Sequence, residues 1–292
     1  MKAISYYIAV PFLYLISLLP PFLCYAFSDL VFFTLYYVIG YRKKIVLGNL
    51  RNSFPEKSEA EIQTIMRAFY SYLCDLFMET FKTLTMSKAF AIRHCPFDEK
   101  AQQLFDSYAD KKQSIIVVMG HLGNWEWAGN SYPLLRKQPL YVLYHPLANK
   151  YWNRLIIHMR QRFGTKLIAM DDAFREMVRN RKEVSVTAFI ADQTPSPENA
   201  YWTTFLGQDT PVFRGTEMIA RKLNFPVVYA SVNREKRGYY KIFAETLFEE
   251  PAKTVDGEIS EAHTKKLEYE IRRQPEIWLW SHRRWKHKRP AK

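Results

Sequence analysis

The stretch SIIVVMGHLGNWEW, residues 114–127, decides the fold. Residues 115–119 are apolar and rich in β-branched side chains, which is typical of a strand buried on both faces. Gly120 ends the apolar run, His121 follows directly, and Glu126 lies five residues beyond His121. The stretch therefore predicts a buried strand whose carboxyl end carries a histidine and a carboxylate.

Further strands and helices alternate after this stretch. Strands are predicted over 140–146, 165–170, 183–192 and 225–235, with a hairpin partner for the last over 238–248. Helices are predicted over 150–164, 171–182, 215–224 and 260–274, and a long amphipathic helix begins upstream at a Ser58/Glu61 capping box. This alternation predicts an α/β domain with a mainly parallel central sheet flanked by helices.

The N-terminus is apolar enough to enter a membrane. Residues 3–28 carry no charge, Asp29 interrupts, and a second uncharged stretch ends at the cationic cluster 42–44. Because about 20 apolar residues span a bilayer, we expect one span over 3–27 followed by an interfacial helix; a re-entrant hairpin or a cleaved signal peptide is the alternative. We divide the chain into an anchor, 1–44, and a larger domain, 45–292, which the cationic cluster predicts to lie on the cytoplasmic side of the membrane.

Composition limits the choice of partners and cofactors. The net charge of +13 over 292 residues suits nucleic acid, an anionic membrane surface or an acidic protein. The three cysteines are widely spaced, which indicates a reducing compartment. The same spacing argues against a structural zinc site in the protein. Nucleotide-binding glycine motifs are missing from the sequence, so we expect no metal and no cofactor. Tryptophans and cations alternate in the tail, 278–290, which suits a membrane interface or an acidic carrier protein; the anchor argues against nucleic acid.

His121 and Glu126 form a candidate catalytic pair. Gly120 and Gly123 permit a turn after the strand, and Asn124 is a candidate N-cap for the following helix. A histidine near a helix N-terminus is favoured in its neutral form, as a general base requires, and a carboxylate on its other ring nitrogen would orient it. Such a pair could activate a hydroxyl to attack an acyl thioester. The alternative is a structural histidine hydrogen-bonded to a glutamate.

Three other residues are candidates for contacts with substrate. Asp192 and Gln193 end another predicted strand, so they should lie at the same rim as His121 and either bind substrate or brace the site. Equally, Asp192 could simply begin a turn before Pro195. Arg214 precedes a helix and suits bidentate recognition of phosphate, with a surface ion pair as the alternative.

Several ordered blocks resemble the lipid A biosynthesis acyltransferase family, the late lauroyl- and myristoyltransferases of Gram-negative bacteria. The blocks are NLRNSFPE (49–56), GHLGNWEW (120–127), YHPLANKYWNRL (144–155), ADQTP (191–195) and WLWSHRRWKHKRP (278–290).

The resemblance implies a fold related to glycerol-phosphate acyltransferases, which usually carry Asp at the position of Glu126. It also implies His121 as base with Glu126 as its partner, and acyl transfer from an acyl carrier protein to a hydroxyl of a lipid A precursor. Many relatives have Arg where this chain has His145, so His145 or Arg154 could take over a phosphate contact. Asn124, within the same motif as His121, is a further candidate for substrate binding.

Two other functions are compatible with the sequence. The chain could acylate a different membrane lipid, such as a glycerophospholipid, an aminolipid or a glycolipid. It could also be a non-catalytic membrane-associated binding protein.

Overall fold

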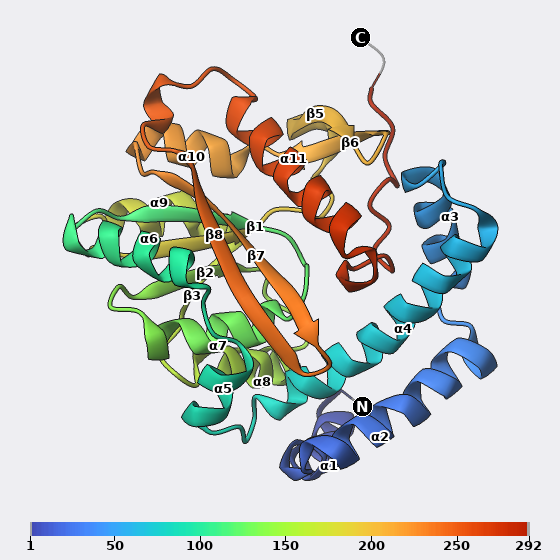
Figure 1. Cartoon of the computed structure of the whole chain (residues 1–292). Coiled ribbons are helices and arrows are strands. Elements are labelled where there is room, and N and C mark those ends of the chain that lie inside the picture. The colour runs from blue at the N-terminus through green and yellow to red at the C-terminus, as the bar shows by residue number, and fades with distance from the viewer. Residues whose placement is uncertain (1, 291–292) are drawn as a thin grey trace.

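A six-stranded sheet forms the centre of the protein, which is described over residues 2–290 in a computed structural model (Figure 1). Its strand order is β3-β2-β4-β1-β7-β8, and all neighbours are parallel except β7 and β8. The strands are β1 (Ile115–Met119), β2 (Leu140–Tyr144), β3 (Lys166–Ala169), β4 (Val186–Ile190), β7 (Val227–Lys236) and β8 (Tyr239–Phe248). The mainly parallel α/β fold predicted from the sequence is confirmed.

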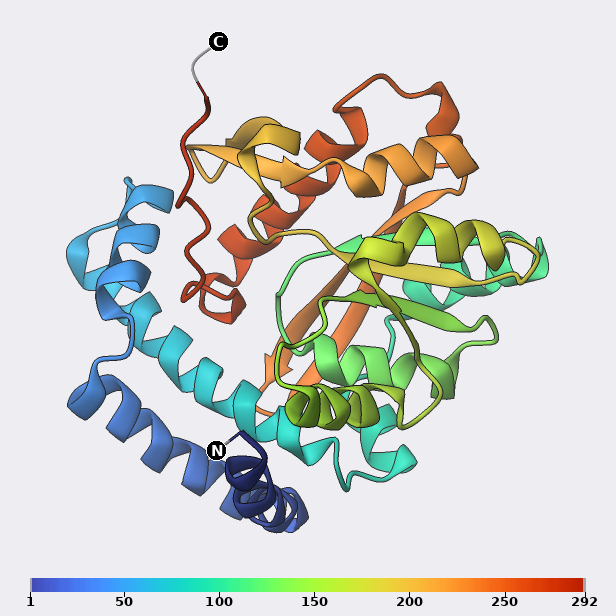
Figure 2. The same ribbon diagram turned by 180° about the vertical axis from the view of Figure 1, so that it is seen from behind.

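Helices cover both faces of the sheet (Figures 1 and 2). One face packs against α9, α10 and α11, and the other against α5, α6 and α7. The helices after the anchor are α3 (Lys43–Ser53), α4 (Glu59–Lys82), α5 (Lys88–His94), α6 (Glu99–Asp110), α7 (Trp125–Leu135), α8 (Lys150–Gln161), α9 (Ala173–Arg179), α10 (Gly215–Leu223) and α11 (Glu258–Arg273). Short 3-10 turns lie at Met170–Asp172, Pro197–Asn199, Pro251–Lys253 and Pro275–Ile277.

The apolar sequence of β1 explains its central place. Ile116 and Val118 belong to the core under α11, whereas Ile115 and Val117 belong to the core under α6 and α7. Successive strand residues point to opposite faces, so a strand covered on both faces must be apolar at every position. The β-branched run therefore specifies a central strand.

The N-terminal anchor breaks at a different place from the one expected. Helix α1 (Lys2–Leu18) ends before Pro20, and a second helix, α2 (Pro21–Phe33), continues as a π-helical turn over Thr34–Ile39. The expected single span over 3–27 is wrong, because the Pro20–Pro21 pair interrupts it. Pro21–Ile39 is one helix long and apolar enough to cross a membrane, and only 17% of its most apolar window is buried against protein.

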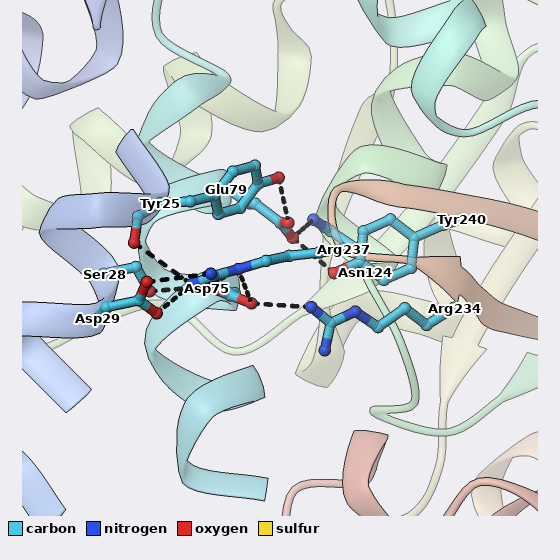
Figure 3. A network of polar contacts seen from close by, with 9 residues as sticks. All are labelled: Tyr25, Ser28, Asp29, Asp75, Glu79, Asn124, Arg234, Arg237 and Tyr240. Atoms are coloured by element: carbon cyan, nitrogen blue, oxygen red, sulfur yellow. Dashed lines mark hydrogen bonds and ion pairs between the residues drawn. The ribbon is translucent and has the colours of Figure 1, made fainter. Parts of the chain in front are cut away.

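A buried ionic network ties the anchor to the domain (Figure 3). Asp75 of α4 is fully buried and accepts hydrogen bonds from Ser28 of α2 and from Arg234 and Arg237 of the β7–β8 hairpin. Arg237 also pairs with Asp29 of α2, at 2.6 Å. Because removing one partner would leave a buried charge uncompensated, the network fixes α2 against α4 and the hairpin.

Two features of the C-terminal half differ from those predicted from the sequence. A separate antiparallel hairpin, β5 (Ala200–Phe205) with β6 (Gln208–Phe213), lies between β4 and α10. Trp278 and Trp280 of the tail are buried, whereas Arg283, Lys286, Lys288 and Arg289 are exposed. The expected interfacial role is wrong for these two tryptophans, because their rings pack against one another and against Phe54 and Phe205.

Candidate functional site

The register of two strands brings His121 and Asp192 together. Strand β1 pairs in parallel with β4, and Met119 lies opposite Ile190. His121 and Asp192 each lie two residues beyond that last pair, so both leave the sheet at the same rim. The chain leaves β1 through α7 on one face and leaves β4 toward α10 on the other. This divergence makes a crevice at the carboxyl ends of the strands, where α/β sheets place ligands.

Asp192 holds His121 through two hydrogen bonds. Its Oδ1 lies 2.6 Å from the His121 ring nitrogen Nδ1, and its Oδ2 accepts the His121 backbone N–H at 2.8 Å. Among the described residues, no group hydrogen-bonds to the other ring nitrogen, Nε2. The contact orients the ring so that Nε2 is the nitrogen free to act on a substrate.

Asp192 remains ionised in its buried position. Burial by itself would raise its pKa, but the charge of His121 and hydrogen bonds from His121 and Trp278 outweigh that effect. The pKa of Asp192 is lowered to about 2. The carboxylate can therefore stabilise a positive charge on His121 throughout the physiological pH range.

Trp278 completes the Asp192 environment and was missed from the sequence. Its indole N–H donates to Asp192 Oδ2 at 2.8 Å, and an isolated bridge pairs Leu122 with Trp278. Trp278 lies 86 positions after Asp192 in the sequence, so no local pattern could reveal this contact. The segment that begins at Trp278 therefore packs against the His121 loop and contacts Asp192.

Glu126 does not contact His121, which corrects the expected pair. Its carboxylate instead accepts hydrogen bonds from Arg160 of α8, at 2.5 Å from Nη2 and 3.0 Å from Nε. Glu126 lies in the first turn of α7, and α8 packs beside α7 and brings Arg160 to it. Asp192 takes the place beside His121 because the β1–β4 register places it there.

The turn between His121 and α7 needs its glycine and its asparagine. Gly123 has φ +59, and a Cβ there would lie 1.9 Å from the Val232 carbonyl oxygen. Asn124 is the N-cap that the sequence predicted, since its Oδ1 accepts the Trp127 N–H at 2.9 Å. Its Nδ2 donates to the buried Glu79 at 2.8 Å. Both ends of the buried amide are therefore used within the protein, which argues against the expected contact of Asn124 with substrate.

A cavity of about 350 Å³ opens beside the His121 ring. His121, Glu126 and Arg160 line it together with apolar side chains. Its buried residues include Phe105, Tyr132, Leu140, Val186 and Ala188. A mainly apolar cavity with a few polar groups is typical of a binding site for a small molecule or a lipid chain.

The remaining candidates lie in different places. His145 and Gln193 are exposed and line the cavity. Arg154 is exposed on α8, and it makes no hydrogen bond or ion pair among the described residues. Arg214 forms an exposed ion pair with Asp256 at 2.7 Å, which is the alternative considered for it. The structure thus brings Asp192, His145 and Gln193 toward His121, and leaves Arg154 and Arg214 outside the cavity lining.

The sequence model for bacterial lipid A biosynthesis acyltransferases matches residues 1–287. The chain belongs to this family. The match confirms the resemblance seen in the sequence blocks and makes the chain a member of an acyltransferase family of lipid A biosynthesis. A search of curated proteins gives no match. In this member of the acyltransferase family, one apolar N-terminal helix suggests a membrane anchor.

Proposed function

We propose that the protein transfers a fatty acyl chain from an acyl carrier protein thioester to a hydroxyl of a lipid A precursor. The single observation that carries the proposal is a histidine oriented by a buried carboxylate at the mouth of an apolar cavity. The family match supports acyl transfer in lipid A biosynthesis. Donor, acceptor and the assignment of individual residues are our inference.

His121 acts as the general base. Its Nε2 takes the proton from the acceptor hydroxyl while the hydroxyl oxygen attacks the thioester carbonyl carbon. The tetrahedral intermediate then collapses, so that the C–S bond breaks and the thiolate leaves with the proton from the imidazolium. Asp192 keeps the ring in the required tautomer and stabilises the imidazolium. The products are an ester and a free thiol, and the base is regenerated.

The cavity beside His121 receives the donor acyl chain. If the carbonyl of the donor thioester lies beside Nε2, the saturated acyl tail would extend along Leu140, Val186 and Ala188. These buried side chains provide an apolar environment for the tail. Burial of each methylene stabilises a bound chain by about 0.8 kcal/mol. The closed end of this cavity would then determine which chain length is preferred.

Glu126 and Arg160 act as a pair at the same cavity. Glu126 shields the Arg160 charge and fixes the guanidinium, whose side chain is 27% exposed. A fixed cation at the cavity wall suits the developing negative charge of an acyl-transfer intermediate. We assign Glu126 to positioning Arg160, Arg160 to stabilising that negative charge, and proton transfer to His121.

Charge supports the proposed donor and the proposed membrane side. Acyl carrier proteins are acidic, and the net charge of +13 favours an acidic protein partner and an anionic membrane surface. The cationic cluster 42–44 follows the apolar helix, which supports a cytoplasmic active site on the inner membrane.

The test is acyl transfer by the purified full-length protein in detergent. The donors are a carrier protein and coenzyme A bearing the same saturated chain, and the acceptors are a tetra-acylated lipid A precursor, a glycerophospholipid and an aminolipid. Gain of one acyl chain by the precursor, measured by mass spectrometry, is the expected result. Transfer only to another lipid would replace the acceptor, and hydrolysis without transfer to any lipid would refute the proposal.

A further inference from the structure

A second apolar cavity lies on the opposite face of the sheet from the first. It has a volume of about 450 Å³ and is bounded by residues of β4, α9 and α10. Val186 and Ala188 of β4 line the first cavity, whereas Phe189 and Ala191 line the second. Because strand residues alternate between faces, the sheet itself separates the two cavities.

The two cavities meet at the rim that carries His121 and Asp192. Leu143, Met170 and Ile190 line both cavities. Ala191, which lines the second cavity, directly precedes Asp192. A ligand in the second cavity would therefore reach the same rim of the sheet as a chain in the first cavity, but from the opposite face.

The second cavity opens to the surface through apolar side chains. Met170, Phe174 and Met218 line it and are 38%, 37% and 61% exposed. Exposed apolar side chains that continue into a cavity are typical of a site for an apolar ligand. Lys222 also lines this cavity, and its cation suits an anionic headgroup at the opening.

We propose that the second cavity binds the tail of the hydroxyacyl chain that carries the acceptor hydroxyl. This inference rests on the proposed function. The donor carbonyl must lie at His121 with its own tail in the first cavity, which contains His121, Glu126 and Arg160. A hydroxyl within an acyl chain reaches the same point only if the rest of that chain lies elsewhere. The second cavity is a separate apolar site at the rim of the sheet that carries His121.

Glycines supply matched variants for a test. A Cβ at Gly215, in the second cavity, meets no atom within 4 Å, and the same holds for Gly129 in the first cavity and for Gly48 outside both. None of the three has a positive φ. Phenylalanine at each position therefore adds the same side chain from a Cβ that meets no neighbouring atom.

Kinetics of the full-length protein separate the two cavities. Gly215→Phe should raise KM for the tetra-acylated precursor about tenfold or more, because one methylene in a pocket is worth about tenfold or more in discrimination. KM for the acyl carrier protein thioester should stay within twofold of wild type for this variant. Gly129→Phe should raise the donor KM instead, and Gly48→Phe should change neither. A folded Gly215→Phe protein with the wild-type acceptor KM would overturn the inference.

Photo-crosslinking tests the site without requiring activity. The probe is the precursor with a diazirine at the end of its hydroxyacyl chain, added to wild type and to His121→Ala. Crosslinks mapping to 171–174 and 215–219 by mass spectrometry are expected in both proteins. Crosslinks confined to 2–39 or to the first cavity would overturn the inference, while transfer by wild type in the same preparation would leave the proposed function standing.

Discussion

The Asp192 carboxylate hydrogen-bonds to His121 at two places, the ring nitrogen Nδ1 and the backbone N–H. The two contacts fix both the loop and the ring with a single carboxylate. Both follow from the β1–β4 register, in which the residues before them are paired. The geometry makes Asp192, rather than Glu126, the partner of His121.

Replacing Asp192 should cripple transfer while preserving the fold. Asp192→Asn should lower kcat about 10²–10⁴-fold, because an amide keeps the shape but neither stabilises the imidazolium nor enforces the tautomer. Asp172→Asn, which alters an exposed ion pair with Arg175, is the control and should keep wild-type activity. Steady-state rates of transfer decide, and an Asp192→Asn protein with wild-type kcat would contradict the assignment.

Asp192 should also contribute a distinctive pH dependence to stability. Its pKa falls from about 3.9 in the unfolded chain to about 2 in the fold. A lowered pKa stabilises the fold above the unfolded value, and this contribution is lost as the pH falls through the folded value. The difference in unfolding free energy between wild type and Asp192→Asn should shrink as the pH falls from about 4 to about 2. Denaturation at each pH measures it, and a difference that does not change between pH 4 and 2 would count against a lowered pKa of Asp192.

Glu79 should have the opposite pH dependence. Burial raises its pKa to about 7 despite hydrogen bonds from Tyr240 and Tyr25 and the charge of Arg234. A raised carboxyl pKa favours the fold most below the unfolded value of about 4.3, and that contribution is lost as the pH rises through 7. Glu79→Gln should therefore unfold with a weaker pH dependence than wild type between pH 5 and 8. Equal slopes for the two proteins would show that Glu79 does not titrate in this range.

Glu126 and Arg160 should behave as one unit. Each residue changed alone to Ala should lower transfer, and the double variant should be little worse than either single variant. Side chains in direct contact show coupling energies of about 0.5–3 kcal/mol. A double-mutant cycle on kcat/KM measures this coupling, with Glu126→Ala and Asp172→Asn as a distant reference pair. Additive effects of the Glu126 and Arg160 changes would rule out a functional pair.

The first cavity should set the preferred chain length. Gly129 lines this cavity, and a Cβ there meets no atom within 4 Å. Gly129→Leu should shift the preference toward shorter acyl chains because its side chain occupies the space of terminal methylenes. Competition among carrier proteins with chains of different length, read by product mass, tests this. An unchanged length profile would place the donor chain elsewhere.

The sequence predicts the fold better than the site. The β-branched run at 114–119 specifies a central strand by itself, and Asn124 reports a helix start through local chemistry. By contrast, the contact between His121 and Asp192 depends on β1 and β4 being neighbours in the sheet. The sequence of a single chain does not reveal the order of its strands in the sheet. The short spacing of His121 and Glu126 predicts a hydrogen-bonded pair, whereas in the structure His121 contacts Asp192 and Glu126 contacts Arg160.

Long-range contacts explain the other differences. Trp278 looked like an interfacial tryptophan because its neighbours are cations, yet it donates to Asp192. The anchor was predicted as one span because hydropathy averages over the Pro20–Pro21 break. In both cases the local composition is compatible with two arrangements, and long-range packing determines which of them forms.

The most direct test of the central claim is single-turnover transfer by His121→Asn beside wild type. The asparagine amide can still donate to Asp192, so the rim should remain folded, but it cannot accept the proton of the acceptor hydroxyl. We predict that wild type adds one acyl chain to the tetra-acylated precursor and that His121→Asn does so at least about 10²-fold more slowly. Transfer by His121→Asn within threefold of the wild-type rate constant would contradict the assignment of His121 as the base.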